Sequence, residues 1–268
     1  MKVWKRSLPV WLLTLVMLLT ACGTPSQPDQ PDGTETWREA YEETGAYLQA
    51  QTAPTVGSIG GEWAVIGLSR AGLLSDETAQ SYEQTVEDYV KQAGSVRLHH
   101  AKSTENSRTI LGLTAAGYNA ANVAGVDLTA GLTDMAYLRA QGTNGPIWAL
   151  IALDCHGYDI PQCADGEEQT TREGLVAEIL SYQCSDGGWA LMGDESDVDM
   201  TAMALTALAP YQEETDVKAA VDAALTYLSD AQQADGGFMS WGAANSESCA
   251  QVIVALTALG IDPASDER

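Results

Sequence analysis

Five apolar stretches recur along the chain and dominate its pattern of hydrophobic and polar positions. Each is rich in Ala, Leu and Ile, and each closes with Gly or Pro, residues that commonly end a helix. They occupy residues 64–72, 109–117, 149–157, 202–210 and 252–260. Because these stretches are apolar almost all round, we expect each to form a buried helix.

More polar segments lie between the apolar stretches. In residues 76–92, 172–182 and 217–232, apolar side chains recur at helical spacing and face Glu, Asp and Gln. Ser75 and Thr215 stand where N-caps are expected. The repeating unit is therefore predicted to be an outer amphipathic helix followed by an inner buried helix. A period of roughly 40–50 residues built from helix pairs indicates an array or a closed ring.

Two connectors share the pattern Gln-x-x-x-Gly-x-aromatic, at Gln183–Trp189 and Gln232–Phe238. Their Asp-Gly-Gly sequence predicts a tight turn. We expect the Gln side chain to hydrogen-bond the next connector and the aromatic ring to pack over the turn. Residues 141–145 form a degenerate copy of this pattern.

These repeats resemble the QW motif of terpenoid cyclases and the wider α/α-toroid superfamily, which includes protein prenyltransferase β-subunits and cobalamin-carrier proteins. The resemblance covers residues 36–268, and bacterial exported lipoproteins with prenyltransferase/squalene-oxidase repeats have the same character. It implies an all-α fold, an α/α toroid of about five helical hairpins. Since such toroids commonly close with six or more hairpins, we expect either an open ring or a truncated version of a longer protein. In both cases the terminal hairpins should expose apolar sides.

The first residues have the character of a targeting segment. Three basic residues precede an apolar run at 8–20, which is too short to span a bilayer and is typical of a signal peptide. Leu19-Thr-Ala-Cys22 resembles a bacterial lipobox, in which the Cys thiol is joined to diacylglycerol; an ordinary signal peptide is the alternative. We expect a signal at 1–21, a tether at 22–36 and the repeat domain at 37–268. The protein would then be exported and anchored through Cys22 to the bilayer, on the outside of the cytoplasmic membrane or on the outer membrane.

Charge and cysteine content narrow the choice of partner and compartment. The net charge of −24 argues against nucleic-acid binding, because such a surface repels phosphate backbones. Export permits disulfides, and Cys155 and Cys163 are the first candidates for a pair because they share a loop. The alternative is that all of Cys155, Cys163, Cys184 and Cys249 are reduced.

In a toroid, the N-terminal ends of the inner helices gather at one mouth of the central cavity. Polar and aromatic residues at those ends would then form a rim, the basis of a ligand site. The alternative is simple capping, because Asp, Asn and Glu also suit helix starts. The candidate ligand-binding residues are Glu62, Trp63, Glu105, Asn144, Trp148, Asp197, Asp199, Trp241, Asn245 and Glu247.

The sharpest local motif is Asp197-Val-Asp199-Met-Thr-Ala202. It resembles the Asp-x-Asp-Asp-Thr-Ala motif of class II terpene cyclases, in which the central Asp protonates an alkene or epoxide. The resemblance assigns Asp199 as general acid and leaves Asp197 as its neighbouring carboxyl, since Met200 replaces the following Asp. Carbocation chemistry also needs aromatic walls, and the inner stretches hold few aromatic residues.

Taken together, these patterns favour a non-catalytic ligand-binding module. A corrinoid or another bulky molecule is the expected ligand, and neither a cofactor nor a metal is required. A cyclase acting through Asp199 and a structural interaction scaffold are the alternatives. A deep aromatic cavity would indicate the cyclase, and a broad polar-rimmed cavity would indicate the binder. A centre filled by side chains would indicate the scaffold.

Overall fold

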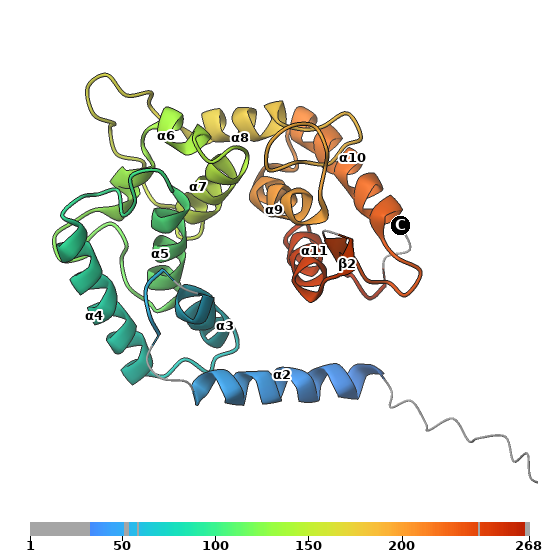
Figure 1. Cartoon of the computed structure of the whole chain (residues 1–268), viewed down its shortest axis with the longest axis horizontal. Coiled ribbons are helices and arrows are strands. Elements are labelled where there is room, and N and C mark those ends of the chain that lie inside the picture. The colour runs from blue at the N-terminus through green and yellow to red at the C-terminus, as the bar shows by residue number, and fades with distance from the viewer. Residues whose placement is uncertain (1–32, 51–53, 58, 241, 266–268) are drawn as a thin grey trace, which may run out of the picture. The chain divides into compact units, whose positions relative to one another are not determined.

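The computed structural model describes residues 33–50, 54–57, 59–240 and 242–265 (Figure 1). The chain divides between Tyr47 and Leu48 into two units. The described part of the first unit lies entirely in helix α2 (Gly33–Gln49), which begins inside the segment predicted to be a tether. The predicted signal and Cys22 lie outside the described residues.

Helices dominate the second unit, so the predicted all-α fold is confirmed. Its inner helices cover the five apolar stretches and pack side by side in chain order (Figure 1). They are α3 (Ala64–Arg70), α5 (Thr104–Ala115), α7 (Asn144–Asp154), α9 (Val198–Leu208) and α11 (Ser246–Ala258). Ile110, Leu150 and Leu205 are fully buried, as the sequence predicts. In α11, by contrast, Ile253 and Val254 are about half exposed, at 50% and 49%.

Outer helices lie against this inner row. They are α4 (Asp76–Ala93), α6 (Met135–Arg139), α8 (Arg172–Ser181) and α10 (Thr215–Ala231). Helix α4 packs on α5, both α6 and α8 pack on α7, and α10 packs on α9. Ser75 caps α4 as predicted, because its Oγ accepts a hydrogen bond from Thr78 N at 3.1 Å. The prediction for Thr215 is wrong: this residue is the first of α10, and Glu214 stands at the N-cap without a side-chain bond.

Glycine ends four of the five inner helices. Gly72, Gly117, Gly157 and Gly260 all have positive φ, a conformation that stops a helix and is easy only for glycine. Helix α9 instead runs into a short 3₁₀ turn at Ala209–Tyr211. The predicted helix stop is therefore confirmed at the four glycines, whereas Pro210 lies inside the 3₁₀ turn that follows α9.

Short elements complete the described chain. A π-helical turn at Ile59–Trp63 leads into α3, and a 3₁₀ turn lies at Leu128–Leu132. Strands β1 (Met239–Ser240) and β2 (Ala243–Ala244) form an antiparallel hairpin before α11. No helix within the described ranges combines the length and apolarity needed to cross a bilayer.

The cysteines differ from the favoured expectation. Cys155, Cys163, Cys184 and Cys249 are all free thiols, so the expected disulfide between Cys155 and Cys163 is not formed. Cys155 Sγ instead donates to Ala152 O, and Cys163 Sγ donates to Glu167 O. The structure therefore agrees with the reduced alternative.

Candidate functional site

The Gln-x-x-x-Gly-x-aromatic connectors position the inner helices. Gln183 Nε2 donates to Gly187 O at 2.8 Å and to Ala220 O of α10 at 2.9 Å. The Trp189 ring is fully buried, and its Nε1 donates to Ile179 O at 2.7 Å. The tight turn and the packed aromatic ring are thus as predicted. The Gln, however, bonds its own turn and the next outer helix rather than the next connector.

Each connector also fixes the residue that caps the following inner helix. Trp189 O accepts from Asp197 N, and Phe238 O accepts from Asn245 N, both at 3.0 Å. Asp197 Oδ1 then accepts from Met200 N at 2.8 Å, and Asn245 Oδ1 accepts from the amides of residues 247 and 248. The capping alternative therefore holds for Asp197 and Asn245.

Two of the predicted carboxylates meet through an arginine that the sequence analysis missed. Glu62 is fully buried; its Oε1 accepts from Gly57 N at 2.8 Å, and its Oε2 lies 3.3 Å from Arg108 Nε. Arg108 Nη2 also contacts Glu105 Oε2 at 2.5 Å. The spacing of Glu105 and Arg108, three residues apart on one helix, was the available sequence signal.

Two tyrosines of α4 complete this acidic cluster. The Tyr82 hydroxyl is buried against Gly112 of α5, where an added Cβ would lie 2.3 Å from it. Burial, followed by the charge of Glu62, raises the pKa of Tyr82 well above its ordinary value. Burial and the nearby Glu105 also raise the pKa of Tyr89. Tyr82 Oη and Glu62 Oε2 are buried without hydrogen-bond partners, so this cluster is polar but incompletely satisfied.

Two of the predicted aromatic residues are in contact. Trp63, just before α3, and Trp148 of α7 pack edge to face, with ring centroids 5.3 Å apart. Trp63 is 39% exposed, and Trp148 is half-buried. The pair therefore presents part of an aromatic surface to solvent at Trp63, the residue that follows Glu62 in the chain.

Asp197 and Asp199 form a second acidic group. Asp199 stands in the first turn of α9, and its Oδ2 accepts from Ser240 Oγ of β1 at 3.4 Å. Its Oδ1 is buried and has no hydrogen-bond partner. Burial raises the pKa of the Asp197 carboxyl, and the negative charge of Asp199 adds to this rise.

The remaining described residues of the predicted rim do not join either acidic group. Asn144 is the half-buried first residue of α7, while Glu247 is exposed and accepts from Ser246 Oγ at 3.0 Å. Trp241 lies outside the described residues. Over the part of the chain that is described, no hydrogen bond or ion pair joins the Glu62 cluster to Asp197, Asp199 or Glu247.

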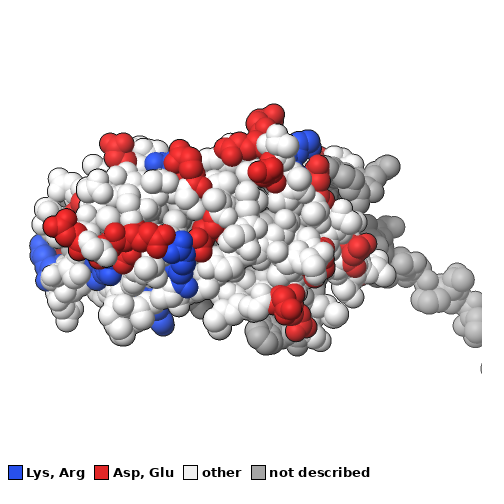
Figure 2. Space-filling model, turned by 90° about the horizontal axis from the view of Figure 1, so that it is seen from above, with Lys and Arg blue, Asp and Glu red and all other residues white. Residues whose placement is uncertain are grey.

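Comparison of this chain with protein-family models, curated proteins and solved structures found no match. The chemistry of the site must therefore be judged from its own residues. Acidic side chains are spread over the face seen in Figure 2, with Lys and Arg mostly among them. Across the described ranges, no group of three or more His, Cys, Asp or Glu side chains is arranged to hold a metal ion.

Proposed function

We propose that the second unit is a toroid-like, non-catalytic ligand-binding module of an exported, lipid-anchored protein. The repeated outer–inner helix pairs and the two matching connector turns support the toroid-like arrangement. The ligand surface would comprise the N-terminal ends of the inner helices, where the Trp63–Trp148 pair and both acidic groups occur.

The observation that carries this proposal is the Asp199 carboxylate. Its Oδ1 is removed from solvent but receives no hydrogen bond, an arrangement that costs free energy until a donor arrives. A ligand with several N–H donors would supply one once the side chains that cover Oδ1 move aside, because this atom has almost no exposed surface. A corrinoid has this chemistry, because amide side chains surround its macrocycle and its flat ring system suits an exposed tryptophan.

The same contacts favour binding over cyclisation. A cyclase acid must deliver a proton, and a neighbouring carboxyl helps to keep that acid protonated. Asp197, the expected helper, is occupied in capping α9 through Met200 N. A donor-bearing ligand therefore fits this carboxylate better than an alkene does.

Titration with cyanocobalamin tests the proposal. Binding should quench tryptophan fluorescence, and ligand at a hundredfold excess over Kd should add about 2.7 kcal/mol of stability. That corresponds to a rise in Tm of roughly 5–10 °C for a unit of this size. Asp199→Asn should weaken binding about tenfold or more, because Asn places an amide donor opposite the ligand's donors. Asp216→Asn is the matched control, since Asp216 also lies in the first turn of a helix but is exposed.

Two results would count against this function. If cyanocobalamin changes neither fluorescence nor Tm, the corrinoid assignment fails; if a wider set of amide-bearing ligands also has no effect, the scaffold alternative is favoured. If the wild-type protein converts a polyprenyl substrate and Asp199→Asn does not, the protein is a cyclase.

The anchor has its own test. In a bacterial host, wild-type protein should sediment with membranes and incorporate labelled fatty acid, because thioether-linked diacylglycerol partitions into the bilayer. Cys22→Ser should abolish the incorporation of label. The variant should either be released from the membrane or accumulate as an unprocessed precursor. A mature protein that begins elsewhere than at residue 22 would contradict lipidation.

A further inference from the structure

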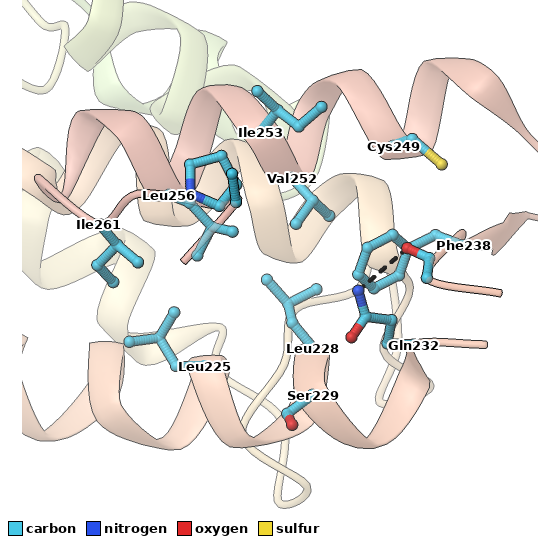
Figure 3. Close-up of a pocket in the computed structure, with 13 residues that line it drawn as sticks. Leu225, Leu228, Ser229, Gln232, Phe238, Cys249, Val252, Ile253, Leu256 and Ile261 are labelled. Atoms are coloured by element: carbon cyan, nitrogen blue, oxygen red, sulfur yellow. Dashed lines mark hydrogen bonds between the residues drawn. The ribbon is translucent and has the colours of Figure 1, made fainter. Parts of the chain in front are cut away.

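An apolar groove of about 380 Å³ lies between α10 and α11. In Figure 3, Leu225 and Leu228 of α10 face Val252 and Leu256 of α11 across it. Phe238 lies at one end of the groove and Ile261 at the other. Ile253, which also lines it, is 50% exposed. A surface this apolar in a chain of net charge −24 is typical of an interaction site.

The repeat itself shows what occupies the equivalent place one hairpin earlier. There, α10 packs on α9 and buries a stripe of small and branched aliphatic residues at helical spacing. This stripe consists of Val217, Ala220, Val221, Ala224 and Leu228. Counted from the caps Asp197 and Asn245, Ile253 of α11 corresponds to Leu205 of α9, which is fully buried. The exposure of Ile253 thus marks a position that the preceding repeat covers with helices.

The two connector turns give the same result independently. At Gly187, an added Cβ would lie 2.7 Å from Ala223 O, so α10 packs directly against this turn. At the equivalent Gly236, which has nearly the same φ, an added Cβ would meet no atom within 4 Å. The second turn has the shape that receives a helix, but its helix-facing side is open.

The hydrogen bonds of the two connector glutamines also differ between the repeats. Gln183 Nε2 bonds both its own turn and the backbone of α10 at Ala220 O. The equivalent Gln232 Nε2 bonds its own turn, at Gly236 O, 3.0 Å away. Its other N–H has no acceptor among the described residues, in the place where Gln183 bonds a helix carbonyl.

We propose that this groove binds an amphipathic α-helix of a partner protein, with a stripe of small and branched aliphatic residues like that of α10. The partner helix would cover Ile253, lie close to Gly236 and accept a hydrogen bond from Gln232. A second copy of this chain is a poorer occupant, because its own α10 stripe is already buried against its α9.

A synthetic peptide with the sequence of α10, residues 215–231, is the probe. It is titrated against the full chain, with fluorescence anisotropy as the readout. Wild type should bind it saturably, though weakly, since an isolated helix of this length is mostly unfolded. A peptide carrying Ala224→Glu should not bind, because the charge would enter the apolar groove.

Ile253→Glu should weaken peptide binding about tenfold or more, because it places a charge in the groove. Val254→Glu is the matched control: Val254 is equally exposed but is not among the groove-lining residues, so binding should stay within about twofold. Gln232→Ala should also weaken binding, whereas Gln233→Ala should not, because Gln233 Nε2 bonds Ala231 O.

Three outcomes would overturn the proposal. One is that wild type does not bind the peptide, and another is that Ile253→Glu and Val254→Glu behave alike. The third is a wild-type dimer in sedimentation that Ile253→Glu converts to a monomer, which would assign the groove to a second copy of the chain. Cobalamin binding is measured in parallel. It should be unchanged by Ile253→Glu, so failure of one proposal is distinguishable from failure of the other.

Discussion

Replacing Arg108 by methionine tests whether the buried acidic cluster depends on its one cation. The Glu62 side chain is fully buried, and that of Arg108 is 22% exposed. In Arg108→Met, the long aliphatic stem remains, but Glu62 retains only the hydrogen bond from Gly57 N. The neighbouring Glu105, which is 19% exposed, loses its partner as well.

The expected loss follows from this burial. Removing one partner of a buried ion pair costs about 3–5 kcal/mol, because the other charge stays desolvated and unpaired. For a unit of this size, the loss corresponds to a fall in Tm of roughly 6–20 °C. The free energy of unfolding is obtained from a urea titration in which the helical circular-dichroism signal is monitored.

A second substitution separates the charge effect from packing. Glu62→Gln in the Arg108→Met background removes the stranded charge but keeps an acceptor for Gly57 N. The double variant should therefore be at least about 1 kcal/mol more stable than Arg108→Met alone. Lys218→Met is the control: Lys218 and Asp222 are 66% and 59% exposed, so breaking their pair should cost no more than about 1 kcal/mol.

Two results would refute this reasoning. One is an Arg108→Met protein within about 1 kcal/mol of wild type, which would mean that water reaches Glu62. The other is a double variant no more stable than Arg108→Met, which would mean that lost packing, rather than the unpaired charge, sets the cost.

Two further predictions concern the connectors and caps. Burial raises the pKa of Asp197 above its ordinary 3.8, so its stabilising contribution is greatest below that pH and is lost as the pH rises through the raised pKa. In Asp197→Asn, the Asn can cap α9 in the way that Asn245 caps α11. Calorimetry should therefore show the stability of this variant rising relative to wild type as the pH increases from 3 to 7. A difference in stability between the two proteins that does not change with pH would contradict this prediction. Gly187→Ala should cost about 2 kcal/mol or more in chemical unfolding, because its Cβ would collide with Ala223 O. Gly236→Ala, at similar φ but in open space, should cost about 1 kcal/mol, and equal losses would exclude a close approach of α10.

The sequence by itself determined the local structure. The continuous apolar stretches located the five inner helices, because a buried helix must be apolar around most of its surface. The Asp-Gly-Gly turns and the caps at Ser75 and Asp197 also followed from sequence, since their hydrogen bonds close within a few residues. Thr215 shows the limit of such signals, because the helix began one residue earlier than its capping character suggests.

Only the tertiary structure decided which of these local features meet. The pairing of Glu62 with Arg108 joins residues before α3 to residues in α5, and its burial depends on how α4 covers them. Gln183 and Gln232 share the pattern Gln-x-x-Asp-Gly-Gly-aromatic, yet of the two only Gln183 bonds a helix carbonyl. Desolvation and contacts between helices depend on how whole helices pack, so two motifs of the same pattern can differ in what covers them.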